Sequence, residues 1–109
     1  MAETPTVTIN ERTFNAYKLE GTTFNNIAAI YVIICVDNQG KWFIVDVGET
    51  GELGDRIENH DRRDCWAKNC DHTLWVCVLS TPSKQYTQKD RLLIEAEIRD
   101  QHNPPCGQK

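Results

Sequence analysis

Two polar side chains, Tyr31 and Asp46, interrupt apolar segments on either side of a turn-forming cluster at 37–40 (Asp-Asn-Gln-Gly). Such a cluster between apolar runs predicts a β-hairpin. If the turn is symmetric about its two central residues, Tyr31 lies directly opposite Asp46 on the same face of the sheet. Directly paired residues have Cβ atoms roughly 5 Å apart. We therefore expect the phenol and the carboxylate to be within hydrogen-bonding reach of each other.

Three further side chains have a spacing that is informative on a helix. Arg56 and His60 are four residues apart, which places a guanidinium one turn from an imidazole that titrates near neutral pH. Glu95 is four residues from both Arg91 and Arg99. Considered separately, the first pair is typical of a solvated helix surface and the second set of a surface ion pair.

The chain has five cysteines, an odd number at irregular spacing. A disulfide framework would leave one thiol unpaired, so we expect reduced thiols in a reducing compartment. Cys35 and Cys77 lie in apolar runs and are expected to be small core residues. Cys65, Cys70 and His72 suggest a zinc site, but the set lacks a C-x2-C pair and an evident fourth ligand, so zinc is the less favoured interpretation.

The elements that must position these side chains can be read from the hydrophobic pattern. Apolar and alternating segments predict strands at 6–9, 27–36, 41–47 and 73–79. Segment 27–36 is almost entirely apolar, which is typical of a central strand covered on both faces. Leu53 and Ile57 predict a short helix after residue 50, and a second helix is expected at 87–102. We expect an α+β fold, a small, mainly antiparallel three- to four-stranded sheet flanked by helices.

Composition and charge place limits on the function. A chain of 109 residues with 39% hydrophobic and 26% charged residues is typical of one globular domain, here taken as 1–109. No apolar run reaches the ~18 residues of a membrane span, and the first residues do not resemble a secretory signal. These observations predict a cytoplasmic protein without membrane association. The net charge of −4 counts against a general nucleic-acid binder, although one short segment could form a local basic face: Arg56, Arg62, Arg63 and Lys68.

The predicted hairpin contains two short motifs, residues 29–31 (Ala-Ile-Tyr) and residues 46–48 (Asp-Val-Gly). These motifs resemble the "GIY" and "YIG" elements of a known family, the GIY-YIG nuclease domain. Residues 48–51 (Gly-Glu-Thr-Gly) are similar to the usual continuation of the second element.

The helical segments extend this resemblance. The spacing of Leu53, Arg56 and His60 resembles the catalytic first helix of the family. Glu95, followed by residues 103–106 (Asn-Pro-Pro-Cys), resembles the metal-binding glutamate and the C-terminal tail. In total the resemblance covers residues 27–107, which is most of the chain.

The resemblance implies hydrolysis of a phosphodiester with one divalent metal ion. It implies that Glu95 binds Mg²⁺ or Mn²⁺ and that Arg56 contacts the non-bridging phosphate oxygens. It also implies that Tyr31 orients or deprotonates the attacking water and that His60 assists proton transfer. The implied partner is a nucleic acid, most simply DNA, and a protein acting in trans would supply any targeting.

Two positions depart from the family pattern in ways that bear on activity. Asp46 stands where the second element has a tyrosine, and Gly107 stands where the tail has an asparagine. A carboxylate at 46 could add a metal ligand, take the role of base, or repel the substrate phosphate. We therefore expect weakened activity, with Asp46 in the catalytic set. The alternative hypothesis is a non-catalytic binding module that retains the fold.

Overall fold

The long apolar segment of the sequence forms the central strand of the protein. In the computed structural model, which describes residues 5–107, this strand is β3 (Ala29–Val36), and every residue of it except Val36 is buried. It lies between β4 (Trp42–Thr50) and β5 (Thr73–Ser80) and pairs antiparallel with both. Successive side chains of a strand point to opposite faces, so an apolar run of this kind needs cover on both faces. The expectation of a central, doubly covered strand is confirmed.

The sheet is larger than expected. The strand order is β1-β2-β5-β3-β4, which makes five strands, with β1 at Thr6–Ile9 and β2 at Arg12–Lys18. The α+β class and the antiparallel pairing are therefore confirmed, but the estimate of three to four strands missed β2. Its pattern alternates between exposed residues and the buried Phe14 and Ala16, which is the period-2 signal of a half-buried strand.

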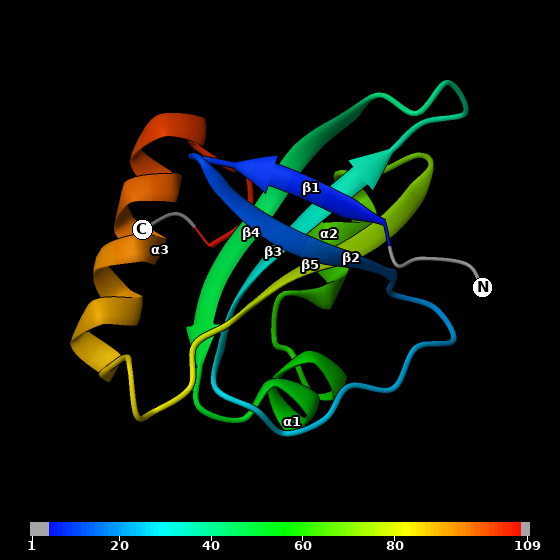
Figure 1. The fold of residues 1–109 in the computed structure, drawn as a ribbon. Helices are drawn as coiled ribbons and strands as arrows, with labels where there is room; N and C mark the ends of the chain where they lie inside the picture. Colours follow the sequence, from blue (N-terminus) through cyan, green and yellow to red (C-terminus); the bar gives the residue numbers. More distant parts are fainter. Residues whose placement is uncertain (1–4, 108–109) are drawn as a thin grey trace.

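Helices cover both faces of the sheet (Figure 1). On one face, α3 (Gln88–His102) packs Ile94 and Ile98 against the even-numbered side chains of β3. On the other face lie α1 (Leu53–Glu58) and α2 (Arg63–Lys68), and α2 contributes the fully buried Trp66. The sequence did not predict α2, because its residues are polar apart from Trp66 and its packing against the sheet is a tertiary effect.

The start of α3 follows the sequence closely. Thr87 accepts a hydrogen bond from the backbone N–H of Asp90, and the Asp90 carboxylate accepts one from the backbone N–H of Thr87. These reciprocal bonds form a capping box and satisfy two backbone donors that a helix start leaves unpaired. The predicted position of this helix is confirmed.

The predicted register of the hairpin is wrong by two residues. Tyr31 pairs with Gly48, and Asp46 pairs with Ile33. The loop contains one residue more than the symmetric turn, because Val36 pairs with Trp42. A β-bulge at Val45 adds a second residue, because Ile34 pairs with Ile44 while Ile33 pairs with Asp46. A slip of two residues preserves the face to which a side chain points, so Tyr31 and Asp46 still share one face as diagonal neighbours.

The expectation of reduced cysteines is wrong for four of the five. Disulfides join Cys35 to Cys70 and Cys65 to Cys106, while Cys77 is a buried free thiol as expected. The zinc interpretation fails as well, because Cys65 and Cys70 belong to two different disulfides. Disulfides are typical of oxidising compartments, so the cysteines no longer favour a cytoplasmic location. Within residues 5–107, no helix has the length and apolar character needed to cross a membrane.

Candidate functional site

Tyr31 and His60 form the centre of a buried polar cluster. Tyr31 points from β3 toward the face covered by α1 and α2, and its hydroxyl oxygen lies 2.7 Å from His60 Nε2. His60 follows the end of α1, and its ring lies 4.4 Å from that of Trp66, measured between centroids. Only 1% of Tyr31 and 5% of His60 are exposed. The imidazole is therefore held between an aromatic ring and the phenol.

The hydrogen bonds assign the tautomer of His60. The backbone N–H of Arg62 donates to His60 Nδ1 at 3.1 Å, so Nδ1 carries no proton. The proton is on Nε2, which donates to the hydroxyl oxygen of Tyr31. Burial, together with the charges of Arg56 and Arg62, lowers the pKa of His60 to about 4. At neutral pH the imidazole is therefore a neutral donor to Tyr31.

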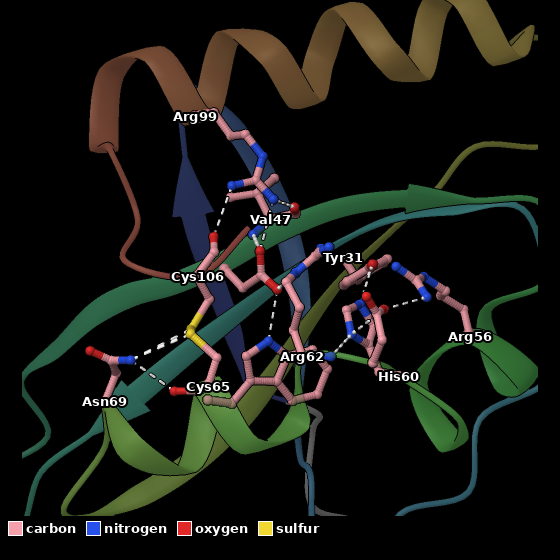
Figure 2. Close-up of polar contacts among 12 residues, drawn as sticks. Tyr31, Val47, Arg56, His60, Arg62, Cys65, Asn69, Arg99 and Cys106 are labelled. Atoms are coloured by element: carbon pink, nitrogen blue, oxygen red, sulfur yellow. Dashed lines mark hydrogen bonds and ion pairs between the residues drawn. A yellow bond between two sulfur atoms is a disulfide. The ribbon is translucent and has the colours of Figure 1, made fainter. Parts of the chain in front are cut away.

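Two guanidinium groups flank the Tyr31 hydroxyl. Burial raises the pKa of Tyr31 above its usual value, and the charges of Arg56 and Arg62 act in the opposite direction. Figure 2 shows Tyr31 between these two arginines, which come from α1 and from the residue preceding α2. Arg56 also donates from Nη1 to Asp61 Oδ1 at 3.0 Å. The phenol therefore faces positive charge on two sides.

Asp46 is a fully buried carboxylate with four hydrogen-bond donors around it. Its Oδ2 accepts from Arg62 Nε at 2.8 Å and from Trp66 Nε1 at 2.7 Å. Its Oδ1 accepts from Arg99 Nη2 and from the backbone N–H of Val47, both at 2.8 Å. Hydrogen bonds from guanidinium groups to a carboxylate are charge-assisted and stronger than those between neutral groups. Because these four donors fill the roughly four acceptor positions of a carboxylate, Asp46 has no vacant position for a metal ion.

Arg99 connects this cluster to α3 across the edge strand β4. Its Nη2 contacts Asp46 and the backbone oxygen of Val47, and its Nη1 donates to the backbone oxygen of Cys106 at 3.0 Å. Its Nε donates to Glu95 Oε2 at 3.2 Å. All three nitrogen atoms of this guanidinium are therefore engaged, and Glu95 is linked to Asp46 through Arg99. Figure 2 shows Arg99 extending from α3 toward Val47 and Cys106.

The five predicted site residues form two groups in the structure. Tyr31, His60 and Arg56 lie together, whereas Asp46 and Glu95 are linked through Arg99. Glu95 lines an open groove of about 650 Å³ between α3, the C-terminal tail and Arg62. Arg56 lines a separate hollow beside α1. Arg62 is adjacent to both groups, since it lines the groove and acts on the Tyr31 hydroxyl.

Three residues of the cluster were missed as site residues by the sequence interpretation: Arg62, Trp66 and Arg99. Arg62 belonged to the basic segment noted in the sequence, and Arg99 was one of two possible partners of Glu95. The other possible partner, Arg91, pairs instead with Glu49 of β4 through a nearly buried ion pair of 2.9 Å. No sequence signal links these residues to Asp46, because they lie 16 to 53 residues away from it along the chain.

The side chains that could act as metal ligands allow only a weakly held metal ion. Among residues 5–107, no three His, Cys, Asp or Glu side chains come close enough to form a metal cluster. Glu95 offers one carboxylate to the groove and shares it with Arg99. Mg²⁺ commonly binds through one or two carboxylates and keeps several water molecules. Glu95 therefore fits a hydrated Mg²⁺ or Mn²⁺ ion, and does not fit a tight site made of protein ligands.

In comparisons with protein-family models, with curated proteins and with solved structures, nothing matches this chain.

Proposed function

We propose that this protein is a metal-dependent phosphodiesterase of GIY-YIG type that acts on DNA or a similar phosphodiester. One observation carries the proposal. The Tyr31 hydroxyl is held by a neutral His60 and flanked by the guanidinium groups of Arg56 and Arg62. A phenol between two cations suits a reaction in which negative charge develops on phosphate oxygens.

The side chains have distinct roles in this proposal. Tyr31 orients the attacking water, and the proton on His60 Nε2 stabilises negative charge on the phenol oxygen. Arg56 contacts the non-bridging oxygens, for which a planar guanidinium has the right shape. Glu95 would hold the hydrated metal ion, which when bound supplies Lewis-acid polarisation of the phosphate.

The two departures from the family pattern fit each other sterically. A Cβ atom at Gly107 would lie 2.6 Å from Arg99 Nη2, 2.9 Å from Asp46 Oδ1 and 3.0 Å from Arg62 Nε. The three polar side chains therefore use the space into which an asparagine at 107 would extend. Since both arginines compensate the charge of Asp46, its repulsion of a substrate phosphate is weaker than the sequence suggested.

A non-catalytic binding module remains the second candidate, because one observation favours it. Tyr31 is 1% exposed, and burial raises the pKa of its hydroxyl. Both features make it a poor base in the free protein. In that case the exposed parts of the two flanking arginines would bind a phosphate backbone without cleaving it.

Plasmid nicking with Mn²⁺ distinguishes the two candidates. Wild type should convert supercoiled DNA to the nicked form, and Tyr31→Phe and Glu95→Gln should each lower the rate about 100-fold, in the range expected for loss of a catalytic group. Glu97→Gln, on the same helix but with its carboxylate half exposed, is the matched control and should nick normally. Wild type that binds DNA without nicking it supports the binding module.

A further inference from the structure

The two arginines that bind Asp46 use their hydrogen-bond donors very differently. Arg99 engages Nε, Nη1 and Nη2 with protein acceptors. The side chain of Arg62 donates from Nε to Asp46, and its two Nη atoms donate no hydrogen bond to any of residues 5–107. Its side chain is 26% exposed and lines the groove that also contains Glu95. Arg62 therefore retains donors that are accessible to a ligand.

The position of Arg62 is fixed at two points. Its Nε is bound to the buried Asp46 carboxylate at 2.8 Å, and its backbone N–H is bound to His60 Nδ1 at 3.1 Å. A guanidinium anchored through Nε presents its Nη atoms as a planar pair of donors, which matches two oxygens of a phosphate. Little side-chain freedom remains to be lost on binding, because the anchor is already formed.

We infer that Arg62 is a second phosphate-contacting arginine, which acts with Arg56 on the opposite side of Tyr31 and is held in place by Asp46. The ligand is a phosphodiester backbone lying from the Tyr31 hydroxyl toward the Glu95 groove. This inference rests on the proposed function, since it names a substrate contact of the same site. It also gives Asp46 the role of a positioning residue, because its carboxylate contacts Arg62 rather than the substrate.

The charge of the groove sets the expected strength of binding. Glu95 and Asp100 line the same groove as Arg62 and Arg99. Negative charge on this wall opposes a polyanion, so affinity should be modest and should fall steeply with salt. The contact made by Arg62 should then account for a measurable share of the total free energy of binding.

Fluorescence anisotropy with a labelled 20-nucleotide DNA in EDTA tests the inference without hydrolysis. Arg62→Ala should weaken binding about tenfold and reduce the salt slope by about one, as expected for loss of one phosphate contact. Arg62→Gln keeps an N–H donor for Asp46 and should show a similar loss, which separates lost charge from misfolding. Arg63→Ala is the matched control: the neighbouring Arg63 donates from Nε to the backbone oxygen of Ile57 at 3.0 Å, so affinity should change less than twofold.

The outcomes separate this inference from the proposed function. If Arg62→Ala and Arg62→Gln bind like wild type, or if Arg63→Ala loses as much, Arg62 is not a specific contact and the inference is overturned. Arg62-dependent binding by a wild type that never nicks DNA supports the inference and rejects the phosphodiesterase. Nicking that is independent of Arg62 supports the phosphodiesterase and rejects the inference.

Discussion

The ring of Tyr31 lies over Gly48, its partner across the β3–β4 pair, so closely that a Cβ at 48 would stand 2.1 Å from both Cζ and the hydroxyl oxygen. The glycine is therefore required by close approach. It lets the phenol lie flat enough against β4 to reach His60 at 2.7 Å. The residue type at position 48 therefore controls the placement of the proposed catalytic hydroxyl.

Gly48→Ala tests this relationship. We expect a loss of about 1–3 kcal/mol in the free energy of unfolding, typical of overpacking in a core, together with loss of the Tyr31–His60 hydrogen bond. Urea denaturation and the imidazole proton resonances of His60 measure the two effects. The matched control is Gly51→Ala, because a Cβ at Gly51 meets no atom within 4 Å. If the two variants are equally stable, the close approach does not control the site.

Asp46→Ala should be strongly destabilising. It removes the acceptor of Trp66 Nε1 and of two arginine side chains. Breaking a buried charge network costs about 3–5 kcal/mol, and partial hydration of the arginines should bring the loss to about 2–4 kcal/mol. Urea denaturation followed by tryptophan fluorescence measures it, with the exposed Asp71→Ala as control. A loss below about 0.5 kcal/mol, the range of neutral surface changes, would contradict the structural role of Asp46.

The stability of the protein should depend on pH through His60. Its pKa is about 4 in the folded state and about 6.5 in the unfolded chain, so the unfolded state binds more protons between these values. The stabilising contribution is complete above about pH 6.5 and is lost as the pH falls toward 4, amounting to about 3 kcal/mol. Denaturation of wild type and His60→Gln from pH 4 to 8 should show this slope only in wild type. Equal slopes would exclude His60 as the cause.

The two disulfides should make large contributions to stability. They close sequence separations of 35 and 41 residues and tie the segment around α2 to β3 and to the C-terminal tail. Chain-entropy arguments give about 3–4 kcal/mol for each. The double variants Cys35→Ser/Cys70→Ser and Cys65→Ser/Cys106→Ser should each unfold at markedly lower urea concentration. Alkylation of unfolded, unreduced protein should modify Cys77 alone, and modification of further cysteines would show that the disulfides do not form.

Much of the fold could be predicted because its signals are local. The apolar run of β3, the Thr87–Asp90 capping box and the spacing of Leu53 and Ile57 all depend on neighbours in the chain. The helix α2 could not be predicted, since Trp66 is its one large apolar residue and its burial needs the whole sheet face. The hairpin register also escaped prediction, because a bulge at Val45 has no distinctive residue type.

The sequence by itself determined the α+β class, the doubly covered β3 and the presence of Tyr31, His60, Arg56, Asp46 and Glu95 as the polar residues worth following. Only the tertiary structure decided how they meet. Asp46 gains Arg62, Trp66 and Arg99 as partners from segments 16, 20 and 53 residues away in sequence. The disulfides likewise join residues 35 and 41 positions apart. Charge pairing and thiol pairing act through space, so these partners depend on packing rather than on any local pattern in the chain.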